Sequence, residues 1–260
     1  KTGCTHITKL LNQIVVGEKQ GKHNPATQEL LDSSRLFVSS IRNPWELYVS
    51  LWSFGCDGGG AFSNRVTKRR AGVLRLSKNP MRLSRLAYRE LTKKTNLWKR
   101  CYADSNDPKL FREWLKMVYD PKFRFDFGEG YGESTVCDFA GIYTYRYLKL
   151  CCRNTQMLGS GTMRSMDDML HFEKDNCYIS QWIRNESLER DFMDAVISSG
   201  EEMTQDEEQL VLSFKRANVS SRSKPSSFYY DGETAELVRE KEALIIKKFG
   251  YSFPKAESKP

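Results

Sequence analysis

The stretch Leu36–Trp52, LFVSSIRNPWELYVSLW, decides the expected fold. LFVSSI is a short apolar and β-branched run typical of a buried strand; Arg42 follows it directly, and Pro44 then opens an aromatic-rich helical pattern. If this strand is central and parallel, its carboxyl end is the side on which open α/β sheets bind ligands. We therefore expect Arg42 at a ligand-binding edge, with Ser50 on the helix that follows.

Arg42 has two possible roles in this position. A guanidinium can hold a phosphate group with two parallel hydrogen bonds, and the hydroxyl of Ser50 would be a neighbouring donor. Alternatively, Arg42 caps the strand end or pairs with Glu46, one helical turn further on. The residues alone leave both interpretations open.

The chain opens on KTGCTHITKLL, in which a lysine, a glycine and small residues lead into a helical pattern. Unpaired amides and the helix dipole make a helix N-terminus favourable for an anion, so a phosphate-like group would fit there. The segment is not a Walker A loop, because G-x-x-x-x-G-K-[ST] occurs nowhere in the chain. A kinase or other NTPase therefore lacks its main support.

Composition bounds the class of protein. A chain of 260 residues with 39% hydrophobic and 28% charged residues suits one large α/β domain, or a domain carrying an insertion. No window approaches the roughly 18 uninterrupted apolar residues of a membrane span. The seven cysteines are scattered and form no C-x-x-C pair, so neither a disulfide framework nor a zinc site is indicated. A reducing, cytoplasmic location is the expectation.

The net charge of +8 is concentrated in one segment. Between Arg65 and Arg100 there are thirteen Lys or Arg residues against one acid, Glu90. Helical spacing in this segment places Arg82 and Arg85 opposite an apolar face. A solvated helix surface and an anion-binding surface both fit this pattern, and no named nucleic-acid-binding motif accompanies it.

Three zones follow from the order of patterns. Residues 1–55 predict an α/β unit with a helix over 6–16, the strand over 35–41 and a second helix from Trp45. The glycines of residues 55–64 then indicate a flexible connector.

A basic, mainly helical middle follows the connector and reaches about Thr162. The last zone predicts a strand over 176–183, a helix that ends at Gly200 and one amphipathic helix over 231–250.

Several of these stretches together resemble the cofactor-binding signature of the sulfotransferases that use 3′-phosphoadenosine 5′-phosphosulfate (PAPS). The matching segments are KTGCT, GKHNP and FVSSIRNPWELYVSLW, with RNESLERDF and the stretch from NVSSRSKPSSFYYDG to KKFGYSF further along the chain. The resemblance covers residues 1–55 and 176–253, most closely to bacterial and carbohydrate-type members. It implies a P-loop-like three-layer fold, with a central parallel sheet flanked by helices. Residues 1–260 would form one sulfotransferase domain, with residues 56–175 as a helical insertion on the acceptor side.

The resemblance also implies roles for individual residues. Lys1 would stabilise charge on the departing phosphate, and Arg42 and Ser50 would bind the 3′-phosphate. His23 would act as the catalytic base, with Lys22 beside it to neutralise the transferring sulfuryl group. The residues expected to cradle the 5′-phosphosulfate are Lys1, Thr2, Gly3, Cys4, Thr5 and His6, and the candidates for a third 3′-phosphate contact are Arg222, Ser223 and Lys224.

The expected reaction is in-line transfer of a sulfuryl group from PAPS to a hydroxyl or amine, leaving 3′,5′-phosphoadenosine (PAP), with no metal required. A histidine suits the base because its ordinary pKa of about 6.5 leaves much of it neutral at physiological pH. Glu29 is the alternative base.

The sequence leaves the identity of the acceptor open. An anionic glycan would suit the basic stretch, whereas a small hydroxylated or guanidinium-bearing metabolite would suit the acids Asp126, Glu129 and Glu133. A basic nucleic-acid-binding protein and a nucleotide-dependent kinase are the alternative functions, although nucleic acid is not the expected partner. The oligomeric state is not indicated.

Overall fold

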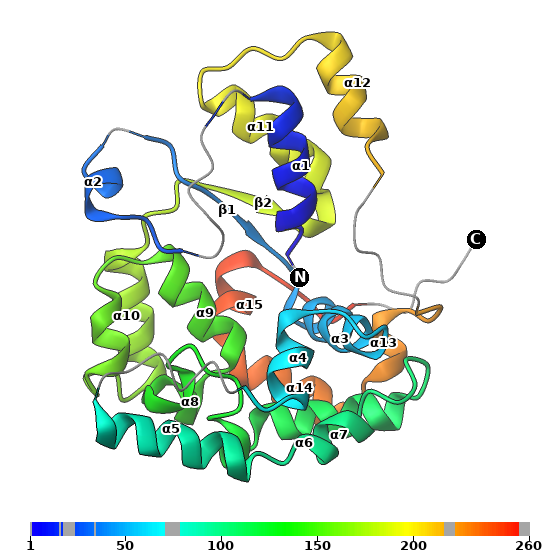
Figure 1. The fold of residues 1–260 in the computed structure, drawn as a ribbon. Coiled ribbons are helices and arrows are strands. Elements are labelled where there is room, and N and C mark those ends of the chain that lie inside the picture. The colour runs from blue at the N-terminus through cyan, green and yellow to red at the C-terminus, as the bar shows by residue number, and fades with distance from the viewer. Residues whose placement is uncertain are drawn as a thin grey trace.

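The computed structural model describes residues 2–15, 17, 24–33, 35–70, 79–215 and 222–254. This part of the chain is mostly helical, and its strands form one small parallel sheet. Figure 1 shows the sheet beside α1 and α11, with the larger helical body on its other side.

The sheet joins two segments that lie far apart in the sequence. Strand β1 (Val38–Ile41) pairs in parallel with β2 (Gln181–Arg184), in the register Val38 to Gln181 and Ile41 to Arg184. The first and last zones of the chain therefore meet in one parallel pair. Within the described residues the sheet has these two strands, and the wider sheet of a three-layer P-loop-like fold is not among them.

The first face of the sheet packs on aromatic helices. Trp182 of β2 points to this face, where Tyr147 of α9 (Ile142–Cys151) stacks on it with ring centroids 5.5 Å apart. Phe249 of α15 (Ala243–Phe249) meets Trp182 edge-on at 4.9 Å. Ile41 of β1 belongs to the same core.

The second face is covered by α1 (Cys4–Ile14) and α11 (Leu188–Ser198). Ile183, the neighbour of Trp182, packs there with Leu10 and Phe192, because successive strand residues point to opposite faces. Both faces of the parallel pair are thus buried, as parallel sheets require.

The other α-helices surround the larger core. They are α2 (Gln28–Leu31), α3 (Pro44–Cys56), α4 (Ala61–Thr67), α5 (Pro80–Thr92), α6 (Thr95–Arg100), α7 (Pro108–Tyr119), α8 (Val136–Phe139), α10 (Met166–Asn176), α12 (Gln205–Ser213), α13 (Ser226–Tyr229) and α14 (Gly232–Lys241). Short 3₁₀ turns occur at Pro121–Phe123, Tyr131–Glu133, Thr155–Gly159 and Asn185–Ser187.

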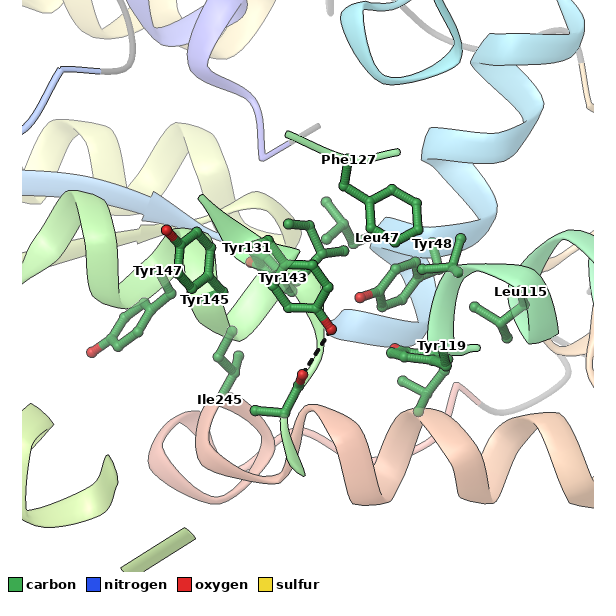
Figure 2. Packing of buried hydrophobic residues seen from close by; sticks show 14 of the residues in the cluster. Leu47, Tyr48, Leu115, Tyr119, Phe127, Tyr131, Tyr143, Tyr145, Tyr147 and Ile245 are labelled. Carbon is green, nitrogen blue, oxygen red and sulfur yellow. Dashed lines mark hydrogen bonds between the residues drawn. The ribbon is translucent and has the colours of Figure 1, made fainter. Parts of the chain in front are cut away.

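Helix α3 is the centre of this larger core. It begins where the sequence predicts, because Pro44 occupies its first turn and the side chain of Asn43 accepts a hydrogen bond from the amide of Trp45 at 3.1 Å. Tyrosines from several helices pack around it (Figure 2). Their hydroxyls have partners inside the protein, as buried polar groups need: Tyr131 donates to the carbonyl of Ala140 at 2.9 Å.

The last helix of the chain differs from the prediction of one helix over residues 231–250. It is broken at Glu242 into α14 and α15, and Glu242 has φ −111°. The Glu242 carboxylate is fully buried and accepts hydrogen bonds from the amide of Thr144 at 2.8 Å, from its hydroxyl at 2.6 Å and from Tyr119 at 3.2 Å, as well as from Tyr48. Sequence periodicity contains no signal for these long-range contacts.

Two further boundaries differ from the sequence expectation. The glycine-rich connector is reduced to residues 57–60, because α3 extends to Cys56 and α4 begins at Ala61. The strand expected over residues 176–183 begins only at Gln181. Its first residues instead pair with the end of α9, in an antiparallel bridge between Cys152 and Cys177.

Candidate functional site

The loop before α1 lies against the carboxyl half of β1. The hydroxyls of Thr2 and Ser40 are hydrogen-bonded at 2.8 Å. The first bond of α1 runs from the amide of His6 to the carbonyl of Gly3 at 2.9 Å, so the amides of Cys4 and Thr5 lie ahead of it, at the positive end of the helix. Figure 1 shows the start of α1 beside the end of β1.

Gly3 is required at the turn into α1. Its φ of 90° lies in the left-handed region, which glycine adopts without strain. A Cβ at this position would lie 2.6 Å from Cδ1 of Leu188, the first residue of α11. The glycine therefore lets the loop backbone approach α11 closely.

Arg42 leaves β1 at the same edge of the sheet. Its backbone is fixed by the hydroxyl of Tyr143, which accepts from the Arg42 amide at 3.0 Å and donates to its carbonyl at 3.1 Å. The next amide, of Asn43, donates to Glu186 at 2.7 Å. The guanidinium of Arg42 lies 3.4 Å from the carboxylate of Glu46, so the ion pair that the sequence left open is present.

Arg222 reaches the same carboxylate oxygen from a distant part of the chain. Its Nη2 atom lies 3.3 Å from Oε2 of Glu46, and its Nη1 atom donates to the hydroxyl of Ser226 at 2.7 Å. The side chains of Arg42, Glu46 and Arg222 are 17%, 25% and 16% exposed. Two guanidiniums thus share one carboxylate, and the trio carries one excess positive charge.

The electrostatics of Arg42 reflect this crowding. Burial lowers the pKa of Arg42, Glu46 opposes that change, and the nearby charge of Arg222 lowers the pKa further. Glu186 acts in the same sense as Glu46 but more weakly. Because two like charges are held together in a half-buried position, a doubly charged anion such as a phosphate would relieve their repulsion.

Ser50 lies one helical turn beyond Glu46 on α3 and is buried. Residues four apart on a helix share a face, so Ser50 and Glu46 lie on the same side of α3. The role of Ser50 as a 3′-phosphate ligand beside Arg42 stays a prediction.

The three candidates for a third phosphate contact separate in the structure. Arg222 joins Arg42 at Glu46. The Ser223 hydroxyl lies 3.5 Å from Oδ1 of Asn106, and the Lys224 ammonium lies over the ring of Phe228, 5.9 Å from its centroid. Arg222 is therefore the one of these candidates that the fold brings to the Arg42 side chain.

Other predicted site residues have different outcomes. Lys1, Lys22 and His23 lie outside the described residues, so their catalytic roles stay predictions. His6 is buried, and its ring meets Phe214 edge-on at 5.4 Å, so its side chain packs on the segment after α12. Glu29, the alternative base, is exposed on α2.

Acids of the loop pair with some cations of the basic stretch and with one on α9. Arg65 and Arg146 both bind Glu129 at 2.6 Å, and Arg89 pairs with Glu133. Burial on its own would raise the pKa of Glu129, but the hydrogen bonds and charges of Arg146 and Arg65 outweigh it and lower the pKa to about 2. Asp126 accepts a hydrogen bond from the Trp98 indole at 2.8 Å. These acids therefore stabilise the fold around α4–α6 and α9.

The described ranges contain neither a cluster of metal-ligating side chains nor a helix that could cross a membrane. Among these residues, no three or more His, Cys, Asp or Glu side chains cluster as metal ligands would. No helix in the same ranges combines the length and apolarity that crossing a bilayer needs.

A hollow in the structure is lined by Arg69 and residues 91–97, which are not among the residues of the predicted cofactor site.

Sequence reasoning missed several residues that shape the site. It noted Glu46 as a partner for Arg42 but not as one shared with Arg222, and it did not single out Ser40, Tyr143 or Ser226. Only their positions after folding bring them together, so no local pattern could have revealed them.

The chain matches no protein-family model, no curated protein and no solved structure.

Proposed function

We propose that this protein is a PAPS-dependent sulfotransferase that transfers a sulfuryl group to a hydroxyl or amine of a small-molecule or glycan acceptor. The observation that carries the proposal is the trio of Arg42, Glu46 and Arg222 at the end of β1. Two residues earlier on that strand, Ser40 is bonded to Thr2 of the N-terminal loop. Residues two apart on a strand are separated by about 7 Å, so the two anion-binding elements adjoin.

The donor groups present fit a nucleotide with a phosphate at each end. Arg42, Arg222 and Ser50 bind the 3′-phosphate, for which guanidiniums offer paired donors in a planar arrangement. The amides of Gly3, Cys4 and Thr5 bind the 5′ end at the N-terminus of α1. When bound, PAPS supplies the activated sulfuryl group.

The chain's own residues then position the acceptor, take up its proton and stabilise negative charge around the transferring group. His23 accepts the acceptor proton on a ring nitrogen, and Lys1 and Lys22 stabilise negative charge around the transferring group. Positioning and electrostatics supply most of the rate enhancement in related phosphoryl-transfer reactions, and we extend that principle here. A P-loop-like three-layer fold is the fold we propose around this site.

Ligand-dependent thermal stability tests the class of function. PAP at about 100 times its dissociation constant adds about 2.7 kcal/mol to the free energy of unfolding. This corresponds to a rise in Tm of roughly 5 to 10 °C for a chain of this size. Arg42→Ala should abolish this rise, whereas Lys224→Ala, which removes a neighbouring exposed cation, should retain it.

ATP with Mg²⁺ and a DNA duplex are the competing ligands in the same assay. A response to either of them without a response to PAP would reject the proposal, as would an undiminished PAP response in Arg42→Ala. Transfer itself is then measured with labelled PAPS and a panel of acceptors. His23→Ala should lose turnover while keeping the PAP response, and full turnover in that variant would move the role of base to another residue such as Glu29.

A further inference from the structure

Cys152 and Cys177 lie directly opposite each other in a short antiparallel bridge. The amide of Arg153 donates to the carbonyl of Asn176 at 2.8 Å, and the amide of Tyr178 donates to the carbonyl of Cys151 at 3.0 Å. These two bonds flank the cysteine pair on either side, which makes it a non-hydrogen-bonded pair. In such pairs the Cα atoms are about 4.5 Å apart and the side chains lie on the same side of the ladder.

This backbone geometry meets the requirement of a disulfide. Bridged cysteines usually have Cα atoms about 4.4 to 6.8 Å apart. Cys152 and Cys177 are direct partners in the antiparallel bridge, so their side chains leave the backbone on the same side. In the structure all seven cysteines, each of which lies in the described ranges, are reduced. A bond between these two would therefore need no movement of the main chain.

The surroundings give the two thiols different reactivity. Cys177 is half-buried, and its sulfur lies 3.8 Å from the ammonium of Lys248 and 3.7 Å from the hydroxyl of Tyr147. Glu173 also faces this site, where it accepts a hydrogen bond from Tyr147 at 2.6 Å and pairs with Lys248. The neighbouring Cys152 thiol, the Ile179 amide, the Tyr147 hydroxyl and the Lys248 ammonium outweigh burial and lower the pKa of Cys177.

Cys152 differs from Cys177 in both its burial and its pKa. It is only 2% exposed, and the neighbouring Cys177 and its burial raise its pKa, so it stays protonated while Cys177 is a thiolate. A half-exposed thiolate beside a buried thiol is the arrangement of an attacking cysteine with its resolving partner.

We propose that Cys152 and Cys177 are a reactive dithiol pair that small disulfides, such as oxidised glutathione, convert into an intramolecular disulfide. The Cys177 thiolate attacks one sulfur of the small disulfide, which forms a mixed disulfide and releases one small thiolate. That thiolate takes up the proton of Cys152. The Cys152 sulfur then attacks the Cys177 sulfur and releases the second small thiolate, which takes a proton from solvent. Two electrons pass from the protein to the oxidant.

The new bond would tie together two parts of the fold. It closes the segment 152–177, which contains α10, and joins the end of α9 to the residues that lead into β2. A loop of this length loses substantial freedom in the unfolded chain when it is closed. We therefore expect the oxidised protein to be more stable than the reduced one. This proposal does not depend on the function of the Arg42 site.

Incubation of the full chain in glutathione buffers of increasing oxidised fraction tests the pair. After acid quenching and alkylation, peptide mapping should show one crosslink, between Cys152 and Cys177, with the other five cysteines alkylated. The Tm should rise by roughly 5 to 10 °C on oxidation and fall back with dithiothreitol. A crosslink between other cysteines, or six or seven alkylated thiols throughout, would overturn the proposal. This measurement needs no substituted chain.

Single substitutions assign the two roles. Cys152→Ser should accumulate a stable mixed disulfide on Cys177, whereas Cys177→Ser should carry glutathione on neither residue. Cys137→Ser is the matched control, because Cys137 is also half-buried and lies 3.6 Å from a cation, Arg124, but its pKa is raised, chiefly by burial. It should oxidise as the unsubstituted chain does. A mixed disulfide that forms on Cys152 in Cys177→Ser would contradict the assignment.

Discussion

Two carboxylates close to α3 lie in opposite electrostatic surroundings. Glu46, near the start of the helix, is partly exposed and contacts two guanidiniums. Glu242, between α14 and α15, is fully buried. Its carboxylate accepts hydrogen bonds from the hydroxyls of Tyr48 on α3 and Tyr119, and from the amide and hydroxyl of Thr144. In the first arrangement two guanidiniums share one carboxylate, with Glu186 also acting on Arg42. In the second a carboxyl group is surrounded by neutral donors.

This contrast distinguishes a carboxylate at the proposed site from a carboxylate in the core. Guanidiniums that share a partly exposed carboxylate can exchange it for an anionic ligand, which suits such a place to binding. A buried carboxylate without a cation favours its protonated form instead, and its hydrogen bonds tie α3, α7, α9 and the α14–α15 break together. The same residue type thus contributes to the proposed site at one place and to the core at the other.

The largest expected effect concerns Glu242. Burial raises its pKa to about 7, against four hydrogen bonds that lower it. Because the folded state holds this proton more tightly than the unfolded state, the group's contribution to stability is complete below pH 4.5, the ordinary pKa, and is lost as the pH rises to about 7. The loss amounts to about 3 kcal/mol.

Urea unfolding at pH 5 and pH 8 measures this dependence. In Glu242→Gln the pH-dependent loss should disappear, because an amide does not titrate and the tyrosine hydroxyls can accept as well as donate. Glu236→Gln, an exposed acid on α14, should keep the slope of the unsubstituted chain. An unchanged slope in Glu242→Gln would show that Glu242 is charged in the folded state at neutral pH.

The next effect tests which cation of the polar loop belongs to the site. Arg222→Ala should weaken PAP binding about 10- to 100-fold, because hydrogen bonds to charged groups contribute roughly 1.5 to 3 kcal/mol each. Ser223→Ala and Lys224→Ala should bind PAP normally, since their side chains face Asn106 and Phe228. Calorimetric titration measures all three, and a loss in Lys224→Ala equal to that in Arg222→Ala would remove the distinction between them.

The smallest expected effect is a gain in PAP affinity. Glu46→Gln removes the negative charge that competes with a phosphate for both guanidiniums, so PAP affinity should rise several-fold, or about 1 kcal/mol, at low salt. The gain should shrink with added salt, which screens charges at this partly exposed site. A fall in affinity would instead mean that Glu46 serves mainly to hold the guanidiniums in position.

Much of the local structure was predictable from the sequence. Pro44 and Asn43 mark the start of α3, the run before Arg42 forms β1, and Gly3 and Gly250 stand at turns with positive φ. The prediction of one helix over residues 231–250 was wrong, because buried contacts of Glu242 override its helical periodicity. The strand expected over residues 176–183 was too long for a similar reason: the bridge between Cys177 and Cys152 occupies its first residues.

The sequence by itself determined the features that depend on neighbouring residues: the caps, the strand that leads into Arg42, and the spacing that puts Ser50 on the same face of α3 as Glu46. Tertiary structure alone decided that Arg222, rather than Ser223 or Lys224, joins Arg42, that Glu242 enters the core, and that Cys152 faces Cys177. Local patterns follow from backbone geometry over a few residues. Contacts across 25 to 194 positions depend on how buried surfaces and charges fit once the whole chain has packed.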